Sequence, residues 1–244
     1  MRFTTEALVI REMDVGESDR LVTMLTREYG VIKAFAAGAK NIKSKKAAAT
    51  GLLSYSSMTI LDKNGTYRIY EATPIRVFFG AGSDVVKLSL SQYFCELAQV
   101  LAPPDNSEEF LRVILNSLHF LTVGSKNPTL IKAITELRIA AISGYMPDLV
   151  GCENCGAFES DIMHFSLTDG HIDCDKCVSG VGLLKIDRTL LTAMRHIVYS
   201  KLEALYSFEI PPAAAERLSE LTSKYILTQT EHRFDTLDFY NAVK

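Results

Sequence analysis

The sequence lacks any apolar run long enough to span a membrane and any familiar catalytic signature. No stretch approaches the roughly 18 consecutive apolar residues that a spanning helix needs. Glu6 interrupts any signal-peptide core near the start, so we expect the protein to stay in the compartment where it is made, the cytoplasm. A Walker A loop, a His-Glu-x-x-His pair and a Gly-x-Ser-x-Gly turn are also absent, and we expect a protein that is not an enzyme.

The chain is not a polycation, but its charge is unevenly distributed. It has 244 residues, of which 48% are apolar, enough for a sizeable core, and its net charge is -3. Residues 1–80 hold 12 Lys+Arg against 8 Asp+Glu, a balance of +4, whereas the other 164 residues hold 14 against 21, a balance of -7. A basic first part on an acidic remainder is typical of a localised anion-binding surface.

The first part of the chain has the pattern of short β-strands. The apolar and β-branched runs lie at 6–13, 20–27, 31–37, 58–62 and 66–72. Asn64-Gly65 separates the last two runs and is a strong hairpin signal, because both turn positions need a positive φ. Five short strands in about 70 residues predict a small barrel, with the OB-type barrel as one option.

From Asp84 the apolar period becomes helical, so the fold class is α+β, a barrel followed by an all-helical domain. Asn106 with Glu109 has the pattern of an N-cap, and Asn127-Pro128 opens a further helix. Residues 145–186 have little helical periodicity. We predict a basic OB-type domain over 1–80, then a helical domain over 81–244 with a metal module at about 149–182.

Four of the five cysteines form two Cys-x-x-Cys pairs, Cys152/Cys155 and Cys174/Cys177. Each pair can direct two thiolates at one ion, and two pairs complete a tetrahedron, so the spacing predicts one structural zinc per chain. The alternative is redox pairs or free buried thiols. Four thiolates leave no position for a substrate, which favours a structural role. The fifth, Cys95, lies in an amphipathic helix and is expected in the core.

Two histidines and many acidic residues lie between the cysteine pairs. His164 and His171 could each replace a cysteine as a ligand, or they are ordinary loop residues. One lysine stands against six Asp+Glu between Cys152 and Cys177, a balance of -5 before the thiolates are counted. Such a surface does not attract phosphates, so we expect the module to stiffen the fold and not to read DNA.

The second signal is a lysine-rich loop over 39–46. It contains four lysines, which are candidates for contacts with DNA phosphates or are simply solvated: Lys40, Lys43, Lys45 and Lys46. Further cations on the neighbouring strands could extend such a patch: Arg11, Arg20, Arg27, Lys33 and Arg68. Phe35 and Tyr67 could stack on bases, although core or barrel-surface positions explain them equally well.

The N-terminal blocks resemble the bacterial RecO family. The blocks that carry this resemblance are 9–11, 15–21, 25–30 and the glycine with the basic loop that follows it at 36–45. The paired cysteines also fall where many members have a zinc motif. The order of barrel, helices, four cysteines and helices matches across nearly the whole chain, although the helical region matches in pattern only.

The resemblance implies a fold and a function. RecO proteins are recombination mediators of the RecF pathway, with an N-terminal OB-fold and a helical C-terminal domain. The family binds single- and double-stranded DNA, anneals complementary strands, partners RecR and the tail of single-stranded-DNA-binding protein, and helps to load RecA. The loop here is all lysine where relatives often have arginines, which favours point-charge contacts.

Two other functions remain open from the sequence. The first is an interaction adaptor whose basic loop binds an acidic protein tail, and the second is an enzyme with an unrecognised site.

Overall fold

The computed structural model describes residues 1–244 except 42, 45, 79–83 and 181. Contacts divide the chain into two compact units, one of residues 1–123 with 234–244 and the other of residues 124–233. Among the residues that the structure describes, no helix is both long and apolar enough to cross a membrane.

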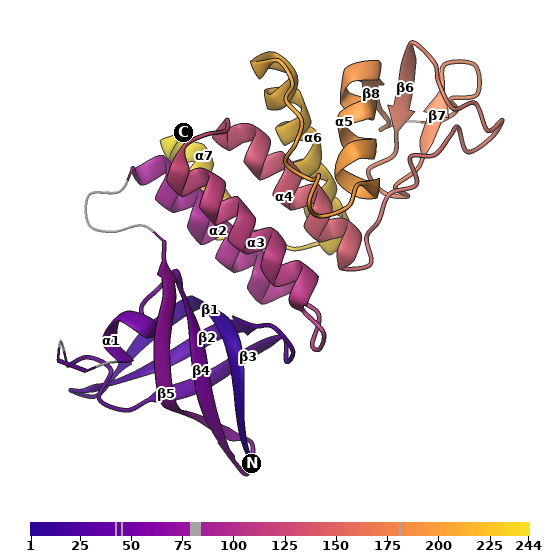
Figure 1. The fold of residues 1–244 in the computed structure, drawn as a ribbon. Coiled ribbons are helices and arrows are strands. Elements are labelled where there is room, and N and C mark those ends of the chain that lie inside the picture. The colour runs from indigo at the N-terminus through magenta and orange to yellow at the C-terminus, as the bar shows by residue number, and fades with distance from the viewer. Residues whose placement is uncertain (42, 45, 79–83, 181) are drawn as a thin grey trace. The chain divides into compact units, whose positions relative to one another are not determined.

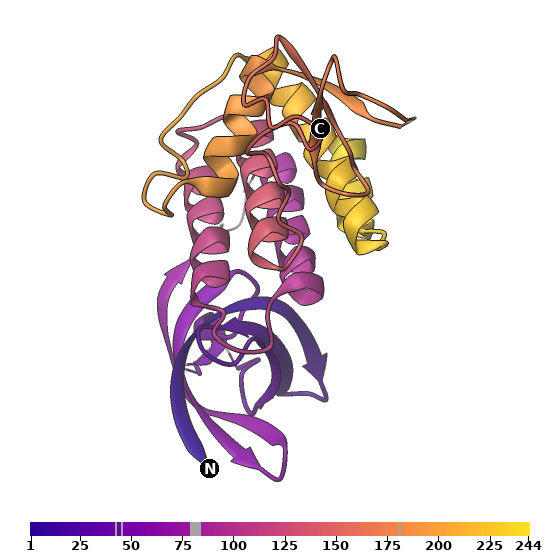
Figure 2. The same ribbon diagram turned by 90° about the vertical axis from the view of Figure 1, so that its right-hand side faces the viewer.

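The N-terminal strands close into a five-stranded barrel (Figures 1 and 2). The strands are β1 (Arg2–Val15), β2 (Asp19–Thr26), β3 (Val31–Ala36), β4 (Ser54–Lys63) and β5 (Thr66–Val77). Around the barrel the order is β1-β2-β3-β5-β4, with β3 and β5 parallel and the other pairs antiparallel. The predicted α+β class and the OB-fold barrel are therefore confirmed.

Small and medium apolar side chains fill the barrel. Its core contains six alanines together with residues such as Met24, Met58 and Ile60. Alternation along β3 is complete, because Ile32, Ala34 and Ala36 are buried while the residues between them are more exposed. The period of two in the sequence therefore fixes which side chains of this strand face outward.

A short helix and a long turn connect β3 to β4. The helix α1 (Lys46–Ala49) packs its Ala49 into the barrel core. The turn before it is tied back, because the Lys40 N–H donates to Ser18 O at 2.9 Å and the Gly38 N–H donates to Asp19 Oδ1 at 2.9 Å. Much of the predicted lysine loop is thus bound to the barrel, and Lys45 lies outside the described residues.

Three helices complete the first unit: α2 (Val85–Leu101), α3 (Glu108–Val123) and α7 (Asp235–Val243). Helix α7 packs on α2, and Glu96 accepts hydrogen bonds from the N–H and hydroxyl of Thr236 at the start of α7. The predicted cap at Asn106 is wrong. Asn106 has a φ of 47° and donates its N–H to Glu28 O, and α3 begins only at Glu108. The backbone at Asn106 therefore contacts the barrel and does not cap α3.

In its described residues, the second unit combines three helices with a small sheet. Its elements are α4 (Pro128–Ile142), β6 (Ile162–Phe165), β7 (Ile172–Cys174), β8 (Leu184–Asp187), α5 (Arg188–Tyr199) and α6 (Pro212–Thr230). Asn127 caps α4 through a 2.9 Å bond from the Thr129 N–H, as predicted. Between α4 and α6 the buried Lys132 and Glu136 form an ion pair at 3.0 Å, and serine and threonine hydroxyls of α6 satisfy both groups.

Candidate metal centre and cationic face

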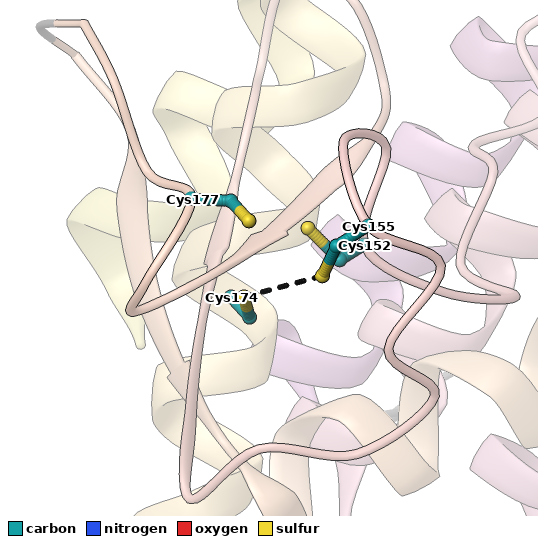
Figure 3. A group of neighbouring side chains, drawn as sticks. All are labelled: Cys152, Cys155, Cys174 and Cys177. Carbon is teal, nitrogen blue, oxygen red and sulfur yellow. Dashed lines mark hydrogen bonds between the residues drawn. The ribbon is translucent and has the colours of Figure 1, made fainter.

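The four paired cysteines converge on one point (Figure 3). Cys152 and Cys155 lie in a turn closed by a 2.8 Å bond from the Gly156 N–H to Cys152 O. Cys174 ends β7, and a 3.0 Å bond from the Cys177 N–H to Cys174 O closes the second turn. A bridge between Cys152 and Ile172 holds the two turns beside each other.

The distances between the sulfur atoms fit one tetrahedral ion. All four Sγ atoms lie within 4.8 Å of one another, and Cys155 Sγ is 3.7 Å from Cys174 Sγ. A tetrahedron with metal–sulfur bonds of about 2.3 Å has sulfur–sulfur edges of about 3.8 Å. The cluster is therefore compatible with a metal site, as the spacing in the sequence predicted.

The four thiols interact strongly with one another. Burial raises the pKa of the Cys152 thiol, but hydrogen bonds from three backbone N–H groups, led by that of Cys174, outweigh it and lower this pKa to about 7. Hydrogen bonds with Cys155 and Cys174 raise the pKa of Cys177 to about 12. Thiols packed this closely all ionise only when a cation neutralises the resulting charge.

The nearby histidines pair with aspartates. His164 Nε2 lies 2.7 Å from Asp175 Oδ1, and His171 Nε2 lies 3.4 Å from Asp173 Oδ2. Among the described residues, the groups placed to share a metal are the four cysteines alone. The two histidines are therefore not placed as ligands. His171 lies in the connection between β6 and β7, whereas His164 is a buried residue of β6, so the interpretation of both as ordinary loop residues is wrong for His164.

Helix α5 anchors the segment that carries the cysteine cluster. Arg195 donates to Leu149 O at 2.7 Å, Val150 O at 3.0 Å and Phe158 O at 2.7 Å, and its guanidinium lies 3.9 Å from the Phe158 ring centre. The Tyr199 hydroxyl accepts the Leu149 N–H at 2.9 Å. The segment that carries the first cysteine pair is thus fixed to a helix on one side.

Two of the predicted DNA-binding arginines are engaged in ion pairs. Arg20 Nη1 is 3.2 Å from Glu12 Oε2 and donates to Ala47 O at 3.2 Å. Arg27 Nη2 is 2.5 Å from Glu108 Oε1, and hydrogen bonding and attraction to Glu108 raise the Arg27 pKa. These partners neutralise both cations locally.

Two lysines of the basic loop are also engaged. Lys40 Nζ is 3.2 Å from Asp14 Oδ2 and donates to Gly16 O at 3.3 Å. Lys46 Nζ donates to Ile69 O at 2.9 Å. Both amines serve to attach the loop to neighbouring strands.

The other four predicted DNA-binding residues in the described part of the chain are exposed, and their charges are uncommitted, that is, not engaged by a partner. They are Arg11, Lys33, Lys43 and Arg68. Within the described part of the chain none of them has a side-chain hydrogen bond or an ion pair, although the charge of Arg68 helps to lower the pKa of Asp19. Hydrogen bonds from Gly38 and Ser18 dominate that shift. We call these four residues the open cations.

Sheet register places two of the open cations in one row. Arg11 on β1 pairs with Thr23 on β2, and Thr23 pairs with Lys33 on β3. Cross-strand partners share a face of the sheet, so the two charges flank Thr23 on the outside of the barrel. Arg68 lies on β5 opposite Phe35 of β3. Phe35 is two residues after Lys33, so both point to the same outer face.

A third cluster joins the barrel to α3. Glu6, Arg27, Tyr55 and Glu108 line a cavity of about 330 Å³. The Tyr55 hydroxyl donates to Glu6 at 2.5 Å, and burial with this bond raises the Tyr55 pKa. Every one of these side chains has a partner, which is typical of a structural connection.

A closed OB-fold barrel followed by helices and a four-cysteine cluster defines a class of protein, the OB-fold proteins with a metal-compatible cysteine module. The family model described as "Recombination protein O N terminal" matches residues 1–78, and the one described as "Recombination protein O C terminal" matches residues 82–238. The chain belongs to the RecO family.

Curated relatives agree along their full length. The chain is 30% identical over 241 residues to the DNA repair protein RecO of Acetivibrio thermocellus, covering 98% of this chain and 96% of the relative. It is 30% identical to the protein of the same name from Myxococcus xanthus, covering 99% and 98%. The corresponding protein of Alkaliphilus metalliredigens is 26% identical, with 100% of both chains covered.

Proposed function

We propose that this protein is a DNA-repair mediator of the RecF pathway that binds the DNA backbone through the open cations of its barrel. It binds single- and double-stranded DNA, anneals complementary strands, and acts with RecR and the tail of single-stranded-DNA-binding protein to help RecA loading. It works in the cytoplasm at the nucleoid and is not an enzyme. The domain over 1–80 carries the DNA site, and 81–244 forms the helical domain.

DNA binding is supported by one observation: some cations of the barrel already have partners, while the open cations have none in the described part of the chain. A cation that already has a carboxylate partner gains little from a phosphate, because it must first lose that partner. The open cations need not break an ion pair before they contact a phosphate. Each phosphate that they neutralise releases condensed counterions, which is the main driving force for sequence-independent binding. Lys45 stays a candidate from the sequence.

The cysteine cluster supports a structural zinc. Zinc prefers four thiolates in a tetrahedron, and the 3.7 Å separation of Cys155 and Cys174 agrees with that geometry. Cys152, Cys155, Cys174 and Cys177 would all be ligands, which leaves no open coordination position for chemistry. Bound zinc would hold the two turns together and neutralise the thiolates.

A second candidate function is an adaptor that binds an acidic protein tail. The same open cations favour it, because carboxylates and phosphates attract the same charges. The two functions differ in their dependence on nucleic acid, and a direct DNA-binding assay separates them.

The test compares two double variants that each remove two positive charges. One removes open cations, Lys33→Gln with Arg68→Gln, and the other removes paired cations, Arg27→Gln with Lys40→Gln. For single-stranded DNA, log affinity against log salt changes by about 0.7 per phosphate contact, so we expect the first variant to flatten the slope by about 1.4. The second variant should change it far less, because its cations are already neutralised.

Fluorescence anisotropy of a labelled oligonucleotide between about 50 and 200 mM salt measures both slopes. Equal flattening in the two variants would mean that only overall charge matters, and would contradict the proposed site. No DNA binding by the unmodified protein, with binding of an acidic peptide that the open variant loses, would establish the adaptor instead.

A further inference from the structure

A row of outward-facing side chains crosses four strands of the barrel, with three apolar residues followed by the open cation Arg68. Register pairs Met13 of β1 with Leu21 of β2, Leu21 with Phe35 of β3, and Phe35 with Arg68 of β5. Paired residues of neighbouring strands share a face, so these four side chains lie side by side on the outside of the barrel. The row has an aromatic ring near its middle and an uncommitted guanidinium at one end.

Phe35 is the aromatic residue of this row, and it is partly exposed to solvent. Phe35 is 39% exposed, and Met13 beside Leu21 is 50% exposed. The flanking Ala34 and Ala36 are completely buried, so the outward direction of Phe35 is fixed by the strand. Neighbouring apolar side chains that stay exposed in one place often mark a binding site.

The other aromatic side chains near the barrel surface are already in contact. Tyr67 packs against the barrel core, and the Phe3 ring lies 6.0 Å from it and 4.6 Å from Tyr29. Tyr70 carries the Arg2 guanidinium 4.7 Å from its ring centre. Phe35 makes no such ring contact with any residue in the described part of the chain.

We propose that Phe35 is a stacking platform for one unpaired base, and that it makes the site selective for single-stranded over duplex DNA. This inference rests on the proposed DNA-binding function and assigns a substrate preference to that site. Met13 and Leu21 supply an apolar floor beside the ring. Lys33, two residues before Phe35 on the same outer face, and Arg68, directly opposite it, neutralise the flanking phosphates.

The selectivity follows from what each form of DNA can present. Every base has a π face, so stacking on an aromatic ring tolerates any sequence. In a duplex these faces are already stacked on neighbouring base pairs, so an aromatic ring cannot stack on them, while the phosphates stay accessible to the cations. A single strand can therefore use both Phe35 and the cations, whereas a duplex can use the cations alone.

The test uses Phe35→Leu, which keeps an apolar side chain but removes the π system. Losing one base–aromatic stack weakens single-strand binding by about tenfold. We expect that loss for single-stranded DNA, no change in duplex affinity, and an unchanged salt slope, because no charge is removed. An unchanged thermal midpoint checks that the barrel is intact.

Phe35→Trp provides the second variant and a direct optical signal. The chain contains no tryptophan, so this variant has a single indole at the proposed contact. We expect it to retain single-strand affinity, with indole fluorescence quenched by single-stranded DNA and not by duplex.

Three results would overturn the inference. The first is Phe35→Leu binding within twofold of the unmodified protein, while the Lys33→Gln, Arg68→Gln variant still loses affinity; the cationic site would then stand without stacking. The second is equal loss of single-strand and duplex binding. The third is unchanged DNA binding with loss of a peptide partner, which would assign the apolar row to protein contact.

Discussion

Gly30 joins the barrel to the connection between α2 and α3, and its replacement gives a quantitative test of that contact. Its φ is +60°, and a Cβ built on it would lie 2.5 Å from Pro103 O and 2.8 Å from Pro104 O. Both neighbours are backbone atoms, which cannot rotate away as a flexible side chain would. Gly30→Ala therefore forces either the turn between β2 and β3 or the proline segment to move.

Gly16 is a matched control for the effect of backbone conformation. Its φ is +59°, nearly the same as at Gly30, but a Cβ there has no atom within 4 Å. Placing alanine in the left-handed region costs about 1 kcal/mol. The steric overlap at Gly30 adds about 2 kcal/mol, by comparison with overpacked cores. We expect losses of unfolding free energy of about 1 kcal/mol for Gly16→Ala and about 3 kcal/mol for Gly30→Ala.

Urea denaturation followed by circular dichroism measures both losses. The midpoints should fall while the denaturant dependence stays constant, because neither change alters the surface exposed on unfolding. The Gly30 variant should also weaken the adjacent 3.0 Å bond from the Asn106 N–H to Glu28 O. If the two variants lose the same free energy, the close approach of the proline segment to Gly30 is refuted.

Two further predictions concern the second unit. Protein prepared without chelators should contain about one zinc per chain by elemental analysis, and Cys155→Ser should lower this content and destabilise the unit; full-length protein free of metal would contradict the proposed site. Asp187 caps α5 through the Leu190 N–H and lies 2.5 Å from Arg217. These contacts, led by the Leu190 hydrogen bond, lower the Asp187 pKa, so the stability that they add is present at neutral pH and is lost as the pH falls through that lowered pKa. Asp187→Ala should destabilise by about 1 kcal/mol at pH 7, and by progressively less in acid; a loss independent of pH would contradict the ionic contribution.

The barrel and the cysteine cluster could both be predicted because their signals are local. Asn64-Gly65 adopts φ values of 54° and 79° at the predicted turn. The cysteine cluster could be predicted from the spacing of the two pairs along the chain, because each pair forms its own turn. Phe35 also has a local signal, since alternation with two buried alanines places it outside.

The state of each cation could not be predicted because its partner is distant in sequence or depends on register. Arg27 pairs with Glu108, 81 residues away. Arg20 pairs with Glu12 because β1 and β2 are adjacent and antiparallel. Composition counts both arginines with Lys33, although only the lysine remains uncommitted. The return of α7 to pack on α2 was likewise invisible, because helical periodicity gives no direction of packing.

Under the proposed function, this difference between counted and uncommitted charge accounts for how a chain of net charge -3 would bind a polyanion. At physiological salt the screening length is about 8 Å, so DNA senses the charges close to its contact surface far more than the sum over the chain. Within the barrel, Glu12 and Asp14 neutralise Arg20 and Lys40 locally. Among the predicted DNA-binding residues that the structure describes, the open cations keep an uncommitted charge, and two of them, Lys33 and Arg68, lie near Phe35 on the outer face. The affinity for DNA should therefore follow the number of open cations, and changes to acidic residues of the cysteine module should leave it nearly constant.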